Sequence, residues 1–155
     1  MPFVPVTPMQ LTTAYAAIAN GGILRRPRIV ASVGGRATRM PAGRRIIATH
    51  TAQQLRTMLT SVVEEGGTAA ASAIDGYTLA GKTGTANKID SKTGEYSKSR
   101  YIASFAGFAP ARDPKLLVTI VVDEPQGEIY GAEVAAPAFA EIVRFALPYL
   151  RIAPG

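Results

Sequence analysis

The sequence of 155 residues contains no cysteine and only one histidine, His50. The absence of cysteine excludes disulfides, thiolate metal sites and a cysteine nucleophile, and it leaves the redox compartment open. A single histidine cannot form a histidine-based metal cluster. We therefore expect neither a bound metal nor a cofactor.

Long apolar runs are missing as well. No stretch reaches the about 18 apolar residues that a membrane-spanning helix needs, and the first ten residues, MPFVPVTPMQ, lack the charged start of a signal peptide. The most apolar segment, 134–150, is interrupted by Glu141 and Arg144. With 47% apolar residues the chain is long enough for one core and too short for two ordinary domains. We expect one soluble unit over residues 1–155.

Negative charge is absent from the first part of the chain. Residues 1–63 contain eight arginines and no carboxylate, and all eleven carboxylates lie from Glu64 onward. Such asymmetry is typical of a solvated face, and it is also compatible with attraction to an anionic polymer or a membrane surface. Aromatic residues are sparse in this basic half and no recognition motif occurs, so we expect no nucleic-acid partner.

Two helices are predicted in the basic half. In VTPMQLTTAYAAIANGG, Thr7 can serve as the N-cap, Pro8 takes the first helical position and Gln10 completes a capping box. In TAQQLRTMLTSVVEEGG, Thr51 and Gln54 can form a second capping box. There Leu55, Met58, Leu59, Val62 and Val63 follow the helical period, which predicts one stripe facing a core.

The second half changes to a strand period. Strands are predicted at 77–83, 101–109 and 115–123, and a final helix at 135–150 is expected to pack on them. The short PARDP link between the last two strands favours an antiparallel hairpin. The link at 87–100 is longer, polar and expected to be mobile. The predicted fold class is α+β, an antiparallel sheet with helices packed on it.

The stretch GYTLAGKTGTA at 76–86 has two interpretations. Gly76 to Thr83 fits the phosphate-loop spacing G-x-x-x-x-G-K-[ST], and LLVTIVVDE at 116–124 resembles a strand that ends in a magnesium-binding aspartate. A phosphate loop, however, follows a buried strand and opens a helix. The residues before Gly76 are small and alanine-rich, and those after Thr83 show no helical stripe. A P-loop nucleotide-binding protein is therefore the third hypothesis.

Read from Lys82, the same stretch gives Lys-Thr-Gly-Thr, a signature of penicillin-recognising serine enzymes. A lysine stabilises a substrate carboxylate, and threonine hydroxyls can hydrogen-bond it. Gly84 leaves no side chain where an acyl group must lie against the backbone. A strand-edge amide can donate to a developing oxyanion, an interaction worth about 3–4 kcal/mol in other enzymes. A second Lys-Thr-Gly, at 92–94, lies in the polar link and predicts only a turn.

With these motifs the chain resembles the C-terminal part of the transpeptidase domain of class B penicillin-binding proteins, a β-lactamase/transpeptidase-like fold. The resemblance rests on VTPMQLTTAYAAIANGG, GGTAAASAIDGYTLAGKTGTA, SFAGFAPARDPKLLVTIVVDEP and GAEVAAPAFAEI, which together cover nearly the whole chain. It implies a peptidoglycan D,D-transpeptidase of cell elongation or division. The implied partners are the peptidoglycan stem peptide, β-lactam antibiotics and the upstream part of the same domain.

The resemblance also implies residue roles. Lys82, Thr83 and Thr85 would contact the substrate or antibiotic carboxylate beside Gly84, and the Thr85 amide would be one of two oxyanion donors. Tyr130 would lie at the cleft rim, although an ordinary surface aromatic explains it better. The implied location is the outer face of the bacterial cytoplasmic membrane, with membrane contact only through an N-terminal anchor that this sequence does not show.

Two of the family's three motifs are absent. None of the seven serines has a lysine three residues later or an asparagine two residues later, so no Ser-x-x-Lys or Ser-x-Asn occurs. We expect this chain alone to be inactive, because a serine without a neighbouring base is a weak nucleophile. Either it is a fragment or split product, as the start at Met1-Pro2 close to a capped helix indicates, or it is a non-catalytic binding or structural module on the same fold.

Overall fold

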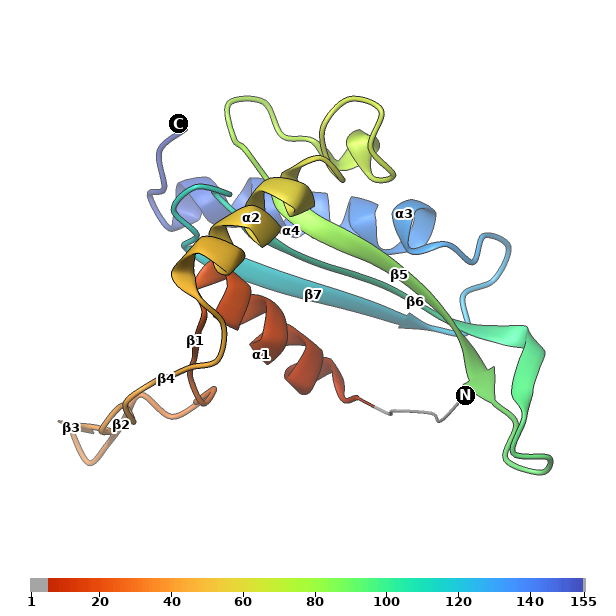
Figure 1. The fold of residues 1–155 in the computed structure, drawn as a ribbon, viewed down its shortest axis with the longest axis horizontal. Helices are drawn as coiled ribbons and strands as arrows, with labels where there is room; N and C mark the ends of the chain where they lie inside the picture. Colours follow the sequence, from red (N-terminus) through yellow and green to blue (C-terminus); the bar gives the residue numbers. More distant parts are fainter. Residues whose placement is uncertain (1–5, 155) are drawn as a thin grey trace.

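A computed structural model describes residues 6–154 and shows a three-stranded antiparallel sheet with helices on both faces (Figure 1). Met1 and Pro2, from which we inferred that the chain is a fragment or split product, lie outside the described residues. The α+β class is confirmed. The elements, in chain order, are α1 (Pro8–Ala19), β1 (Ile23–Leu24), β2 (Ser32–Val33), β3 (Arg36–Ala37), β4 (Arg44–Arg45), α2 (Thr49–Thr60), the 3₁₀ turn η1 (Ala70–Ser72), β5 (Ala80–Ile89), β6 (Tyr96–Ala109), β7 (Leu116–Asp123), α3 (Gly131–Val134) and α4 (Ala136–Tyr149).

The main sheet has the order β5-β6-β7. The last two strands and their hairpin are confirmed, but the first strand begins at Ala80 and continues to Ile89. The polar link expected at 87–100 is therefore largely strand, because Asn87 pairs with Tyr101 and Ile89 with Tyr96. Polar residues also suit an exposed two-stranded ribbon, so the prediction from polarity alone made the loop too long.

The final helix packs on one face of the sheet as predicted. Phe139, Val143 and Leu147 of α4 are fully buried, and Phe139 lies against Phe105 of β6 with ring centroids 4.7 Å apart. A Cβ on Gly107 would lie 2.8 Å from the Phe139 ring, so this glycine makes room for the aromatic pair. Each large buried side chain contributes about 1.5–3 kcal/mol to folding.

The opposite face is covered by α1 and α2. Thr12 of α1 donates a hydrogen bond to Thr119 of β7 at 2.8 Å, and Leu59 of α2 packs on buried Phe108 and Ala80. Figure 1 shows α1 and α4 on opposite sides of the strands. No helix within residues 6–154 is long and apolar enough to cross a membrane.

The strands β1 to β4 form an arm that extends away from the body (Figure 1). Ile29 on this arm is 95% exposed. The five ion pairs within the described residues all involve residues from Lys88 onward, so none of the arm's arginines pairs with a carboxylate there. Whether the arm meets an anionic surface stays a prediction.

One of the two predicted capping boxes forms. Thr7 and Gln10 exchange hydrogen bonds of 3.2 and 2.8 Å at the start of α1. The second prediction is wrong: α2 begins at Thr49 after Ala48, which makes no side-chain cap, so Thr51 lies inside the first turn. The stripe on α2 is also shorter than expected, because the helix ends at Thr60 and Met58 is 64% exposed.

This difference between the two threonines can be measured. Thr7→Ala is expected to lower the free energy of unfolding by about 1 kcal/mol, because it removes a cap acceptor. Thr51→Ala, the matched control, is expected to leave it unchanged or raise it by a few tenths of a kcal/mol, since alanine has the higher helix propensity. Urea unfolding followed by circular dichroism measures both, and equal losses would contradict the cap assignment.

Candidate active site

Lys82 lies inside a strand that continues for seven more residues, to Ile89. The chain continues as a strand directly after Thr83, so no helix N-terminus lies there to hold a phosphate. The aspartate that resembled a magnesium ligand, Asp123, instead pairs with Lys88 at 2.8 Å. The phosphate-loop hypothesis is therefore wrong, and no group of three or more potential metal-ligating side chains occurs in residues 6–154.

Every second residue of β5 directs its main-chain N–H and C=O toward the open edge of the sheet. Within the described residues β5 has a strand partner, β6, on one side only. The carbonyl of Tyr101 accepts from Glu124 N–H at 2.9 Å and so points toward β7. The main-chain N–H and C=O of its partner on β5, Asn87, must then point away from β6. Because main-chain direction alternates along a strand, the N–H of Thr85, two residues earlier, also points away from β6, toward the open edge.

The side chain of Lys82 lies at this open edge. Lys82 is exposed, and its Nζ donates to the carbonyl oxygen of Thr83 at 3.0 Å and to the Thr83 hydroxyl at 3.3 Å. It forms no ion pair with any described carboxylate. The ammonium group is thus free of a competing anion, and it lies beside a hydroxyl that can bind the same ligand.

The hydroxyl of Thr85 contacts the first residue of α3, Gly131. Its Oγ1 accepts a hydrogen bond from the backbone N–H of Gly131 at 3.3 Å. A hydroxyl can accept and donate at once, so Thr85 can still donate to a ligand. Tyr130, directly before Gly131, is 58% exposed. The structure therefore brings the loop that carries Tyr130 next to the strand that carries Lys82. The Tyr130 and Lys82 side chains are not hydrogen-bonded to each other.

Two glycines allow a close approach of main chains at this point. A Cβ on Gly131 would overlap the carbonyl oxygen of Ser104 and would lie 2.7 Å from that of Gly84. A Cβ on Gly84 would lie 2.5 Å from the Ser104 hydroxyl oxygen. The Ser104 hydroxyl can turn to another rotamer, so packing at 84 is close but does not by itself require glycine. The sequence did not predict Ser104 and Gly131 as neighbours of Gly84. Ser104 is placed there by the pairing register of β5 and β6, and Gly131 by the path of the loop between β7 and α3.

We define the strand wall as residues 82–85 of β5. A cavity of about 510 Å³ lies beside it, between β5 and the start of α1. It is lined by the start of α1, by β5 from Gly84 to Ile89, and by Ile102, Ser104 and Val121. Most of this lining is apolar. The strand wall therefore has an open polar edge and an apolar hollow next to each other.

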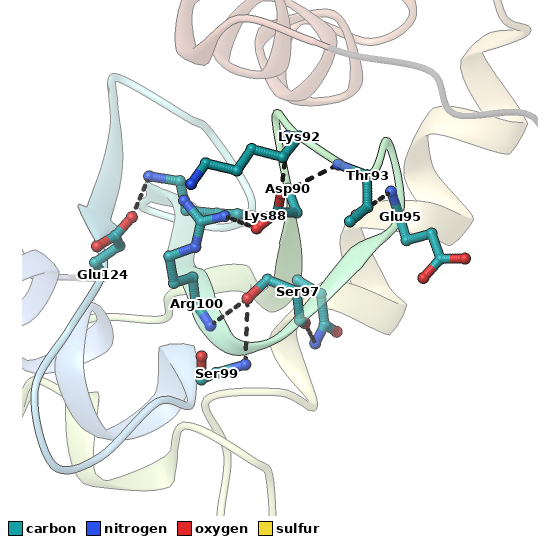
Figure 2. Close-up of polar contacts among 10 residues, drawn as sticks. Lys88, Asp90, Lys92, Thr93, Glu95, Ser97, Ser99, Arg100 and Glu124 are labelled. Carbon is teal, nitrogen blue, oxygen red and sulfur yellow. Dashed lines mark hydrogen bonds and ion pairs between the residues drawn. The ribbon is translucent and has the colours of Figure 1, made fainter.

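A polar cluster follows the strand wall along β5 (Figure 2). Lys88 Nζ lies 2.8 Å from Asp123 Oδ1 and 2.7 Å from Glu124 Oε1. These hydrogen bonds, to Asp123 first and then to Glu124, raise the pKa of Lys88. Backbone N–H groups of the turn lower the pKa of Asp90, which also pairs with Arg100 at 2.9 Å.

An edge strand that carries Lys-Thr-Gly-Thr, in a sheet with helices on both faces, is typical of penicillin-recognising serine enzymes. Residues 4–144 match the family described as the penicillin binding protein transpeptidase domain. The chain belongs to this family, and the predicted relation to the C-terminal part of a class B domain is confirmed.

Its relatives include stage V sporulation protein D of Bacillus subtilis, 42% identical over 97% of this chain. The probable peptidoglycan D,D-transpeptidase PenA of Neisseria meningitidis is 40% identical over 94%. In both cases the chain spans only 24% of the relative.

Solved structures agree. The transpeptidase domain of Burkholderia pseudomallei penicillin-binding protein 3 matches with a TM-score of 0.82 at 38% identity, over 97% of this chain and 44% of that chain. Penicillin-binding protein 3 of Mycobacterium tuberculosis in complex with ampicillin matches with a TM-score of 0.87 at 34% identity, over 97% and 36%. The sheet and its helices are thus part of a larger transpeptidase domain fold.

Proposed function

We propose that residues 1–155 form part of the transpeptidase domain of a peptidoglycan D,D-transpeptidase and supply the strand wall of its active site. The observation that carries the proposal is the open edge of β5, where the Thr85 amide and the unpaired Lys82 ammonium lie together. The upstream part of the same domain would supply the serine nucleophile and its base. The site would lie outside the cytoplasmic membrane, where peptidoglycan is assembled.

Each residue of the strand wall then has a role. Lys82 and the hydroxyls of Thr83 and Thr85 bind the carboxylate of a stem peptide or a β-lactam through charge-assisted hydrogen bonds. The Thr85 amide donates to the oxyanion that forms when the serine attacks the carbonyl. Gly84 keeps the acyl group close to the backbone, and Tyr130 lines the rim. Ampicillin in the mycobacterial relative is consistent with a β-lactam as ligand.

Acylation by a fluorescent penicillin tests this function in the full-length protein that contains this chain. Lys82→Ala is expected to slow acylation by about 10²–10³-fold, the usual loss when one transition-state donor is removed. The matched control is Lys92→Ala in the second Lys-Thr-Gly, which lies in an exposed turn and is expected to change the rate less than about twofold.

Other outcomes would contradict the proposal. Equal rates for the two variants would remove Lys82 from the site. Reversible penicillin binding without acylation of the full-length protein would favour the non-catalytic module. Covalent labelling of the 155-residue chain by itself would show that the nucleophile lies within it.

A further inference from the structure

The arm formed by β1 to β4, residues 23–45, carries positive charge only. It has neither lysine nor carboxylate, and its seven arginines are Arg25, Arg26, Arg28, Arg36, Arg39, Arg44 and Arg45. All seven are exposed. The arm extends away from the sheet and its helices (Figure 1), and within residues 6–154 no carboxylate forms an ion pair with any of these arginines. The described part of the chain therefore does not neutralise this positive surface.

Two of the arginines hold the arm together. Arg28 Nη1 donates to the carbonyl oxygen and the hydroxyl of Thr38 at 3.0 and 2.9 Å, and Arg45 Nη1 donates to the carbonyl oxygen of Gly21 at 2.7 Å. The other five guanidinium groups make no hydrogen bond or ion pair within residues 6–154. These five groups are available to an anionic partner.

The arm also exposes apolar side chains beside the arginines. Ile29 is 95% exposed, Val33 68% and Met40 55%. An open hollow of about 380 Å³ on the arm brings the two kinds of side chain together. Its lining includes Arg26, Arg28, Arg39, Ile29 and Val30. Cationic and apolar groups thus border the same place on the surface.

This combination favours a phospholipid surface over other anionic partners. A guanidinium can bind a phosphate through two parallel hydrogen bonds, and adjacent apolar side chains can enter the boundary between headgroups and acyl chains. A polyanion in solution would use the arginines but would leave Ile29 in water. A protein partner that adds a strand would find little edge, because β2 and β3 have only two residues each. A bilayer surface, in contrast, accepts a projecting arm without a matching groove.

We propose that the arm docks on an anionic phospholipid bilayer, with Arg26 and Arg39 at headgroup phosphates and Ile29 in the apolar boundary. This inference goes beyond the proposed function, because it involves no residue of the strand wall. Either can fail without the other. If both hold, the arm sets how the active site is oriented relative to the membrane.

Hydrogen exchange of the arm, followed by mass spectrometry, tests the contact in the full-length protein that contains this chain. The protein is reconstituted into vesicles of phosphatidylcholine alone or of phosphatidylcholine with phosphatidylglycerol. Exchange over residues 25–45 is expected to slow about threefold or more only with phosphatidylglycerol, because docking excludes water from amides that otherwise open freely. The exposed turn at 91–95 is the internal reference and should exchange equally in both kinds of vesicle.

A pair of matched variants tests the role of charge. The double variant Arg26→Gln/Arg39→Gln is expected to weaken docking about 30-fold, because each basic residue near an anionic surface strengthens binding about fivefold. The lipid-dependent slowing should then disappear. Lys92→Gln/Lys98→Gln removes the same charge from exposed positions of the β5–β6 hairpin and should leave the slowing unchanged.

A second pair tests apolar insertion. Ile29→Ser is expected to weaken docking about tenfold, since each CH₂ group buried in the bilayer adds to the affinity. Because Ile29 is 95% exposed, the substitution should not disturb the fold. Phe145→Ala, at an exposed aromatic on α4, is the control and should leave the slowing unchanged.

Several results would overturn the inference. These are equal exchange of the arm in the two kinds of vesicle, a wild-type response of the double arginine variant, and a wild-type response of Ile29→Ser. Slowing by soluble polyphosphate or polyglutamate in phosphatidylcholine vesicles would assign the arm to an anionic polymer or to an acidic protein instead. Penicillin acylation should be the same in all these variants as in the wild type, so a failure of the proposed function would leave the docking result intact.

Discussion

Phe139→Ala is expected to lower the free energy of unfolding by about 3–5 kcal/mol, the range for aromatic truncations in protein cores. Phe139 is fully buried and packs against Phe105 at a centroid distance of 4.7 Å. Its removal leaves a cavity between α4 and the sheet that Gly107 cannot fill. Because domains of this size are stable by about 5–15 kcal/mol, such a loss can unfold the protein at moderate temperature.

The matched control lies on the same helix. Phe145 is 71% exposed and stacks only on Tyr149, so Phe145→Ala is expected to cost about 1 kcal/mol at most. Urea unfolding of both variants gives the two free energies. Similar losses would mean that the outer and inner faces of α4 have been assigned wrongly.

Gly131→Ala is expected to cost about 2–4 kcal/mol, because the new methyl group would meet main-chain atoms that cannot rotate away. The nearest are the carbonyl oxygen of Ser104, which the methyl carbon would overlap, and that of Gly84, 2.7 Å away. The substitution should also displace the hydrogen bond from residue 131 to Thr85. Acylation should therefore fall together with stability.

A glycine in the loop directly before α3 serves as the control. A Cβ on Gly127 would meet no atom within 4 Å, although its φ of 83° makes alanine strained. Gly127→Ala is thus expected to cost about 1 kcal/mol and to leave acylation unchanged. Thermal unfolding and penicillin labelling measure both effects. A tolerated Gly131→Ala would show that α3 does not approach β5 this closely.

Local patterns predicted much of the fold. The capping residues Thr7 and Gln10 were enough to predict the start of α1. Alternation of side chains predicted most of β6, and a run of β-branched residues predicted β7. Thr51 misled, because a threonine three residues before a glutamine fits a cap and also fits the interior of a helix that begins earlier. The polar composition of 87–100 misled because exposed ribbons and loops share it.

The candidate site divides in the same way. Lys82, Thr83 and Thr85 lie within one short motif, which was enough to find them. Ser104 and Gly131 are distant in sequence, Gly131 by 46 residues from Thr85, and their contacts depend on register and on how the loop returns. The partners of Lys88 lie 35 and 36 residues away. Nothing in their local sequence distinguishes them from ordinary charged residues at a strand end.

The contact of Gly131 with Gly84 and Ser104 is made by main-chain atoms alone. Such a contact has no rotamers, so its spacing cannot widen or narrow when a side chain turns. The loop that carries Tyr130 therefore cannot move closer to the strand that carries Lys82 without displacing main-chain atoms. Atomic radii thus set the smallest distance between these two segments, and no change of rotamer can reduce it.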